Sequence, residues 1–455
     1  MFRTIDPNDT SYVLTLTEIA STYFTAKKYQ EAVETASEAM KYKSEHLHRL
    51  YIIKGNALDQ AGFPDSAIML YNKALIKFPY SYLLHFNKGI TYTNQKKYEP
   101  AIEAFQQAIR LNPFHASSHL VLGKICALMG HYTHAMLSLE TFLIIDPNSE
   151  RSNPNLVFLN NFVNNALGSD YEKITPSGPN AFSEIDHVIG SGFALNEGYK
   201  MKLKFNAPVA KQSQLLFESL KYTPNTGDFW MEYYVPLFLN AKQNNHTDDF
   251  ICKILTTASD KTIAKEVSKR EKNIREMNKV LSSSLSKIHT NIKVKDGSER
   301  LADIFLNEDN IMISMGKYTS DGSSKTGNWT FYHLNGEVKE DGKYSNEGKL
   351  EGLWYNYNND GTLSTTETYL NGEMHGEYTG FFPDGKIKFK ANYINGIPEG
   401  DVQYFYNCDA VSAVIPFKNG SRNGKGISYY KNGVIKEEYF YKKRHITRRK
   451  PRLLF

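Results

Sequence analysis

In the first third of the chain, small and apolar residues return at helical spacing about every 34 positions. One small position of each unit is held by Ala20, Gly55, Gly89 and Gly123, in steps of 35, 34 and 34. A second lies twelve residues later, at Ala32, Ala67, Ala101 and Ala135, and three of the units close at Pro79, Pro113 and Pro147. Small residues let two helices approach closely, and a proline cannot continue a helix because it lacks the donor. The pattern predicts four pairs of antiparallel helices over residues 13–149.

The last third has a shorter period, near 24 residues, and the alternation of strands. Its glycines recur at Gly327, Gly352, Gly376, Gly400 and Gly424, and aromatic residues follow each at Tyr344, Tyr369, Tyr393, Phe417 and Tyr441. Between them stand Asn335-Gly336, Asp360-Gly361, Asp384-Gly385 and Asn432-Gly433, with Cys408-Asp409 in the fourth unit. Such dipeptides favour two-residue hairpin turns in which both residues have positive φ. We therefore expect five hairpins in one antiparallel ladder. Trp354 and Tyr357 are three positions apart, so on a regular strand their side chains point to opposite faces of the sheet. Either both faces carry functional or packing residues, or a bulge turns one of the two side chains to the other face.

The segment between the two arrays shows no repeat. Residues 155–166 read as a helix that caps the first array, and residues 260–288 carry apolar positions at steps of three and four, which predict one long helix. The fold class that follows is multidomain α + β. Its domains are a helical solenoid at 1–168, a helical connector at 169–300, a β-hairpin repeat sheet at 301–441 and a basic tail at 442–455.

The helical array resembles the tetratricopeptide repeat, whose period and small, aromatic and proline positions it matches over four units. In that family the first helix of each repeat lines a concave groove that binds peptides. Carried over position by position, the resemblance implies a groove formed by Arg49, Ile52, Asn56, Asp59, Leu83, Phe86, Ile90, Thr93, Ser117, Leu120 and Lys124. Either a partner peptide or a neighbouring helix of this same chain fills this groove.

The hairpin array resembles the MORN repeat, in the variant of bacterial YwqK-like antitoxins. The motif is carried best by Tyr369-Leu-Asn-Gly-Glu-Met-His-Gly376-Glu-Tyr378. The resemblance implies an antitoxin that occludes a partner toxin through its sheet, and the MORN name also carries an association with membranes.

Charge and composition narrow the class of protein. The chain has 455 residues with 54 Lys and Arg against 49 Asp and Glu, a net charge of +5. Seven of the basic residues fall between 442 and 452, so the rest of the chain has no excess of positive charge. Specific nucleic-acid binding by the whole chain is therefore unexpected. The basic tail is either a disordered solubilising end or a contact for anionic membranes or acidic partners. Mean hydropathy is −0.48, and three distant cysteines without CxxC spacing argue against disulfides or zinc. We expect a cytoplasmic protein.

The search for catalytic chemistry gives little. Gly322–Thr326 resembles a phosphate loop but has Ser324 where that loop needs glycine, so a surface hairpin loop is favoured. His115 and His119, with His131 and His134 nearby, could in principle bind a metal, but ordinary packing is the better interpretation. We predict no enzyme activity, no cofactor, no metal and no small-molecule substrate.

The predicted function is a non-enzymatic scaffold that binds one or more proteins or peptides through the helical groove and the β face. The alternatives are an antitoxin-like protein and recruitment to a membrane surface by the sheet and tail.

Overall fold

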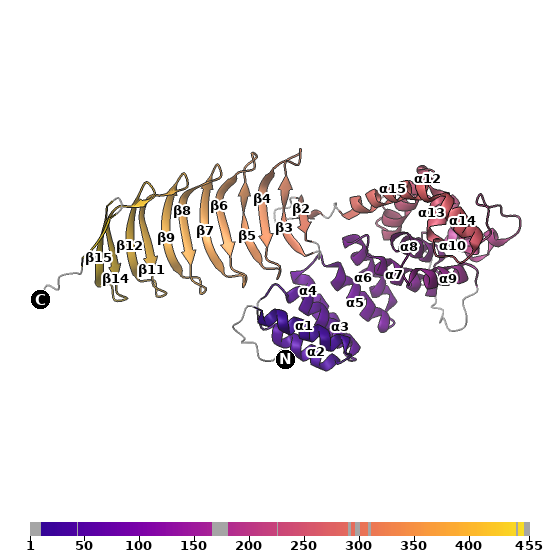
Figure 1. Cartoon of the computed structure of the whole chain (residues 1–455), viewed down its shortest axis with the longest axis horizontal. Coiled ribbons are helices and arrows are strands. Elements are labelled where there is room, and N and C mark those ends of the chain that lie inside the picture. Colours follow the sequence, from indigo (N-terminus) through magenta and orange to yellow (C-terminus); the bar gives the residue numbers. More distant parts are fainter. Residues whose placement is uncertain are drawn as a thin grey trace. The chain divides into compact units, whose positions relative to one another are not determined.

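The computed structural model (Figure 1) describes residues 11–42, 44–165, 181–224, 226–289, 293–295, 301–307, 311–442 and 445–449. By their contacts the residues divide into two compact units. The first comprises 1–61, 72–80 and 293–455, and the second 62–71 and 81–292.

The first eight helices follow the predicted helix pairs. They are α1 (Tyr12–Thr25), α2 (Tyr29–Ala39), α3 (Leu47–Gln60), α4 (Pro64–Lys77), α5 (Tyr82–Asn94), α6 (Tyr98–Leu111), α7 (Ala116–Leu128) and α8 (Tyr132–Ile145). In the second unit α5 packs on α6, α6 on α7 and α7 on α8. The small residues explain the close approach: a Cβ on Gly89 would lie 2.8 Å from the Phe105 ring, and one on Gly123 would lie 2.6 Å from Leu139. Only glycine leaves room for these partners.

The connector is helical and shares one hydrophobic core with the third and fourth repeats. After α9 (Ser152–Val163) come α10 (Ser183–Gly190), η2 (Phe193–Leu195), α11 (Pro208–Ser219), η3 (Trp230–Tyr234), α12 (Val235–Gln243), α13 (Thr247–Ile254), α14 (Lys261–Lys269) and α15 (Glu271–His289). Helices α10 and α13 pack on α8, and α11 packs on α9. The aromatic stretch at η3 is buried. The predicted boundary near 168 lies outside the described residues.

The predicted single helix over 260–288 is two helices, which corrects the sequence-based expectation. Asp260 caps α14 by accepting from the backbone N–H groups of Thr262 and Ile263, as a helix start requires. The helix ends at Arg270, whose φ is −98° and ψ 4°. The Arg270 guanidinium binds Asp249 at 3.1 Å and Glu266 at 3.3 Å. Val267 and Ile274 on either side of the break keep the same helical face, so the apolar pattern did not indicate that the helix ends here.

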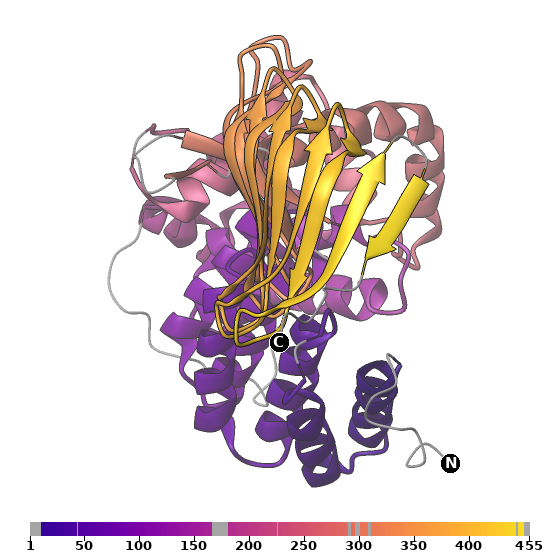
Figure 2. The ribbon, with the colours of Figure 1, turned by 90° about the vertical axis from the view of Figure 1, so that its left-hand side faces the viewer.

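The strands form one antiparallel sheet whose hydrogen-bonded order follows the chain (Figures 1 and 2). They are β1 (Lys293–Lys295), β2 (Leu301–Leu306), β3 (Met312–Tyr318), β4 (Lys325–Tyr332), β5 (Val338–Tyr344), β6 (Leu350–Tyr357), β7 (Leu363–Leu370), β8 (Glu373–Phe381), β9 (Ile387–Ile394), β10 (Ile397–Pro398), β11 (Gly400–Phe405), β12 (Val411–Lys418), β13 (Ser421–Arg422), β14 (Gly424–Tyr429), β15 (Ile435–Lys442) and β16 (His445–Arg449). This confirms the multidomain α + β class.

The sheet extends beyond the predicted hairpin array at both ends. Strands β1 and β2 pair ahead of the first repeat, and β16 pairs with β15 inside the segment assigned to the basic tail. Residues 450–455 of that tail lie outside the described residues. Gly322 lies in the turn between β3 and β4, where a surface hairpin loop was expected.

The hairpin turns correct a second expectation. Asn335, Asp360, Asp384 and Asn432 do not have positive φ; only the glycine that follows each of them does. In the first such turn the N–H of His333 donates to the carbonyl of Glu337, and the N–H of Gly336 donates to that of His333. These are three-residue loops that end in one left-handed residue, a form that places a bulge beside the turn. In the fourth hairpin Asp409, with φ 64°, takes the glycine's place.

The two-residue turns with two positive φ angles occur instead between repeats. They are Asn371-Gly372, Asn395-Gly396 and Asn419-Gly420. Each stands between paired strand ends, for example Ile394 and Ile397. The sequence pattern therefore placed the turns correctly but assigned the tighter type to the wrong set.

Among the described residues, no helix combines the length and apolar character needed to cross a membrane.

Candidate interaction surfaces

The two periodic features of the sheet meet each other across every hairpin. The register pairs are Gly327 with Tyr344, Gly352 with Tyr369, Gly376 with Tyr393, Gly400 with Phe417 and Gly424 with Tyr441. All five glycines have positive φ, which only a residue without Cβ adopts at little cost. Register partners share a face of a sheet, so each repeat places one ring opposite a bare backbone position on the same side.

This side carries a run of aromatic side chains, which we call the aromatic face. By register and strand alternation it includes Trp329, Phe331, Tyr344, Trp354, Tyr369, Tyr378, Phe389, Tyr393 and Tyr404. Consecutive rings contact one another, as with Trp354 and Tyr344 at 5.2 Å and Tyr378 and Phe389 at 4.9 Å. The face is packed largely by its own rings.

The two tryptophans of this face lie over further glycines. A Cβ on Gly316 would be 2.2 Å from the indole of Trp329, and one on Gly342 would be 2.2 Å from that of Trp354. The indole N–H of Trp354 donates to the carbonyl of Lys343 at 3.2 Å. Both indoles are almost fully buried. The Lys325 ammonium lies 4.5 Å from the centre of the Phe331 ring, a cation–π contact at the edge of the run.

The opposite face carries exposed apolar side chains. Tyr357 points to this face and Trp354 to the aromatic face, so both faces are used, although bulges also accompany each turn. We call the exposed set the apolar row: Leu353, Leu370, Ile394 and Ile397, with 44–46% of each side chain's surface exposed. Leu353 lies within β6, Leu370 and Ile394 are the last residues of β7 and β9, and Ile397 is the first residue of β10.

The proposed groove residues of repeat two lie on α3. Arg49 is exposed and forms an ion pair with Glu18 of α1; its second guanidinium nitrogen is 3.1 Å from that carboxylate. Ile52, Asn56 and Asp59 are half-buried. The polar members already have partners within this chain.

On α5, the first helix of repeat three, Leu83, Phe86 and Ile90 recur at helical spacing and are half-buried. Phe86 and Ile90 also pack against the core of the second unit. Thr93 donates its hydroxyl to the carbonyl of Gly89 at 2.8 Å. We call Leu83, Phe86 and Ile90 the α5 stripe.

The groove residues of repeat four lie on α7. Ser117 accepts from the Arg151 guanidinium at 2.9 Å, and the Lys124 ammonium lies 5.5 Å from the centre of the Phe158 ring. Leu120 belongs to the hydrophobic core, with 8% of its surface exposed. Ser117 and Lys124 therefore contact residues just before α9 and within it.

The histidine pair of the sequence analysis is engaged in packing. The Nε2–H of His119 donates to the carbonyl of Pro113 at 2.9 Å, and its Nδ1 accepts from the Tyr234 hydroxyl at 2.7 Å. Burial lowers the pKa of His119 to about 4. His115 lies 2.8 Å from the Ser118 hydroxyl. Both nitrogens of His119 are therefore occupied by the fold itself.

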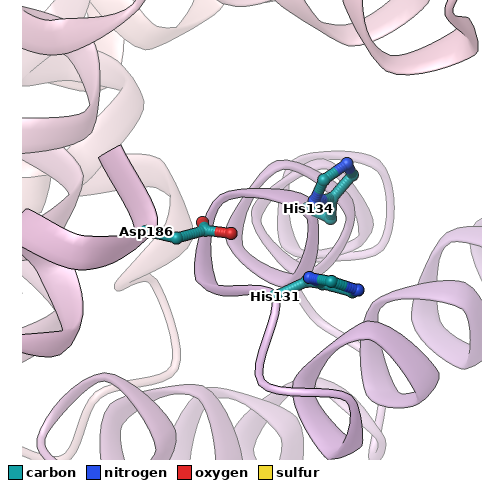
Figure 3. A group of neighbouring side chains, drawn as sticks. All are labelled: His131, His134 and Asp186. Carbon is teal, nitrogen blue, oxygen red and sulfur yellow. The ribbon is translucent and has the colours of Figure 1, made fainter. Parts of the chain in front are cut away.

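A different histidine group brings three possible metal ligands together (Figure 3). His131 precedes α8, His134 lies in its first turn, and Asp186 reaches toward them from α10. One nitrogen of each imidazole and one carboxylate oxygen all lie within 4.8 Å of one another. Asp186 Oδ1 accepts from the backbone N–H of Thr133 at 2.6 Å. Burial lowers the pKa of His134 to about 3, which keeps this imidazole neutral.

One further ionisable group is fully buried in the second unit. Glu140 on α8 has no exposed surface, and its Oε1 lies 2.7 Å from the Ser213 hydroxyl. That hydroxyl is also 2.8 Å from the carbonyl of Val209. That hydroxyl has one proton for these two acceptors, so protonation of Glu140 Oε1 leaves the Ser213 proton for Val209. Within the described residues, Glu140 Oε2 is buried without a hydrogen-bond partner. Burial raises the pKa of Glu140 to about 8.

Neither Asp186 nor Glu140 was singled out from the sequence. Asp186 is 52 positions from His134, and it lies in a segment without a repeat. Glu140 stands in an ordinary helical pattern. No local signal marks either residue, because their surroundings come from helices that are distant along the chain.

Family models match both arrays. The tetratricopeptide repeat matches residues 82–115, and the MORN repeat variant matches residues 325–346, 374–395 and 422–443. One tetratricopeptide repeat and three repeats of the MORN variant are therefore matched at these residues. A search of curated proteins found no match.

Several solved structures are similar to this chain. The crystal structure of the MamA protein is 15% identical over 48% of this chain and 100% of MamA, with a TM-score of 0.31. A MamA mutant is 19% identical over 35% of this chain and 90% of its own, with a TM-score of 0.28. The structure of Naa15/Naa10 bound to HypK-THB is 19% identical over 60% of this chain and 39% of the matched one, with a TM-score of 0.28. None of these scores reaches 0.5, so this likeness supports no conclusion about function.

Proposed function

We propose that this protein is a non-enzymatic scaffold that binds protein partners at two places, the α5 stripe of the helical repeats and the apolar row of the sheet. The apolar row carries the proposal. Four large aliphatic side chains, each nearly half exposed, stand on one face of the sheet, whereas the periodic residues of the opposite face pack among themselves.

The two faces of the sheet differ in packing, and this difference supports the proposed function. The repeat-defining glycines and rings stabilise the ladder on the aromatic face. The side chains of the apolar row lie on the other face from those rings, and exposed apolar groups on one face of a sheet favour protein interaction. Each Leu or Ile that a partner covered would contribute roughly 1 kcal/mol, at about 25 cal/mol per Å² of apolar surface.

The test is quantitative capture from native lysate with the full chain as bait. Leu370→Glu with Ile394→Glu introduces two charges into the apolar row, and Leu83→Glu does the same in the α5 stripe. We expect the first variant to lose one set of captured proteins at least tenfold and the second to lose a different set.

Two exposed apolar residues outside both surfaces provide matched controls. Val434 lies in the β14–β15 turn and Met69 lies on α4, exposed at 57% and 72%. Val434→Glu and Met69→Glu should capture the same proteins as the unchanged chain. Identical capture by all five baits would contradict the scaffold function. Loss of a single toxin-like partner by the sheet variant alone would point to the antitoxin-like form of this function.

A further inference from the structure

We propose that His131, His134 and Asp186 form a binding site for a divalent transition-metal ion, of which Zn²⁺ is the representative, that fastens α10 to the first turn of α8. Two imidazoles and one carboxylate are the donor set that zinc takes in proteins, with the remaining position filled by water.

The histidine group contains a buried polar atom that the described residues leave without a hydrogen-bond partner. Among the described residues, the Nδ1 of His134 and the Oγ1 of Thr133 are buried without a hydrogen-bond partner. His134 has 7% of its surface exposed. Buried polar atoms are nearly always satisfied by protein, water or an ion. The unpartnered Nδ1 belongs to one of the three clustered residues, which indicates that a further group belongs beside it.

The second argument is geometric. Ligands of a tetrahedral zinc ion stand about 3.3–3.5 Å apart, given bonds near 2.0–2.2 Å. The three donor atoms already lie within 4.8 Å of one another, so they must draw together by at most about 1.5 Å. His131 is half-buried and precedes α8, so its side chain is the one expected to make most of that change.

The surroundings hold two of the ligands in place. The backbone N–H of Thr133 binds one carboxylate oxygen of Asp186, which is the outer-sphere contact that orients metal ligands. His134 is held edge-on between Phe182 and Trp230, at ring distances of 5.2 and 4.5 Å. These ring contacts fix the orientation of the imidazole, and preorganised ligands favour metal binding.

One effect opposes the site. The start of α8 carries the positive end of the helix dipole, which disfavours a cation. The Asp186 carboxylate, bonded to an N–H of that same turn, offsets this charge. Imidazole ligands also exclude Mg²⁺ and Ca²⁺, which prefer oxygen donors only.

The experiment measures Zn²⁺ binding by equilibrium dialysis of the full chain after chelator treatment, at about 1–100 μM free metal. Co²⁺ absorption reports the coordination geometry. We expect about one Zn²⁺ per chain at saturation. His131→Gln and Asp186→Asn should each weaken binding at least tenfold, because loss of an outer-shell partner alone costs that much.

His187→Gln is the matched control, because His187 neighbours Asp186 on α10 and is exposed. It should bind like the unchanged chain. His131→Gln leaves the bond between Thr133 and Asp186 intact, so it keeps the test valid if Asp186→Asn fails to fold. No Zn²⁺ bound by the unchanged chain over this range, or less than a tenfold loss in His131→Gln, would overturn the proposal.

Discussion

At the residue scale, the glycines of the sheet serve two distinct physical purposes. Gly352 has a φ of +70° with no atom within 4 Å of where its Cβ would be, so it is required by the backbone. Gly342 has no such φ, but a Cβ there would collide with the Trp354 indole. Its purpose is to make space for a ring. The two kinds of glycine should respond differently to the same substitution.

We expect Gly342→Ala to lower the free energy of unfolding of the sheet by about 2–4 kcal/mol, because the indole must leave its buried position or strain its neighbours. Gly352→Ala should cost only about 1–2 kcal/mol, the penalty for a left-handed non-glycine residue. Urea unfolding followed by tryptophan fluorescence measures both, and exposure of Trp354 should shift the emission of Gly342→Ala to the red. An equal or smaller loss in Gly342→Ala than in Gly352→Ala would contradict this interpretation.

Glu140 gives a residue-scale prediction about pH. Burial raises its pKa from 4.5 to about 8, so between these values the folded state holds a proton that the unfolded state has released. The contribution of Glu140 to the free energy of unfolding is therefore most favourable below about pH 4.5. It falls as the pH rises toward 8, by at most about 1.4 kcal/mol per pH unit. Glu140→Gln, which resembles the neutral acid, should remove this fall. Urea unfolding at pH 5, 6, 7 and 8 provides the comparison, and equal pH slopes for the two proteins would exclude the effect.

At the element scale, the hairpins show which local signals were sufficient. Glycine spacing located the turns within and between the five repeats, but it left open which face of the sheet the aromatic residues share. The turn type was not readable, because Asn-Gly and Asp-Gly occur both in two-residue turns and at the end of three-residue loops. The closing hydrogen bond, between His333 and Glu337 in the first repeat, decides between them.

The turns between repeats carry a prediction of their own. Asn395 has φ 49°, and asparagine tolerates this region better than other non-glycine residues. Asn395→Ala should destabilise the sheet by about 1 kcal/mol, whereas Asn395→Gly should be nearly neutral. Asn432→Ala is the control, because Asn432 does not have positive φ. The midpoint of urea unfolding measures these differences, and an equal loss in Asn395→Ala and Asn395→Gly would show that the side chain, not the backbone angle, matters.

The broken helix near Arg270 is the other lesson at this scale. Val267 and Ile274, on either side of the break, are seven residues apart, which would keep them on one helical face, so periodicity alone predicts one helix. Arg270 instead ends α14 and binds acidic residues of α13 and α14. A contact between separate helices overrides a local preference here.

At the scale of the whole molecule, the three tryptophans report on different parts. Trp230 lies in the helical core of the second unit, and Trp329 and Trp354 lie in the sheet. Repeat arrays are held by contacts between neighbouring repeats, so separate units need not unfold together.

We expect two urea transitions with different midpoints. Trp230→Phe leaves only the sheet tryptophans, and Trp329→Phe with Trp354→Phe leaves only the helical one. Fluorescence of these two variants should give midpoints that differ from each other, and both transitions should appear in the unchanged chain. Far-ultraviolet circular dichroism of each variant controls for changes in stability caused by the substitutions. Coincident midpoints in all three proteins would show that the chain unfolds as one cooperative unit.

The amino-acid sequence determined the repeats, their periods, the helix pairs, the hairpins and the glycine and aromatic positions that recur in each hairpin. These features are local and periodic, so each is written within a few dozen residues and then repeated. Tertiary structure alone decided where Arg270 ends a helix, that Lys124 of repeat four contacts α9, that Glu140 is buried, and that Asp186 meets His131 and His134. Those outcomes depend on contacts between segments far apart in the chain, and the local sequence pattern does not indicate which distant segments meet.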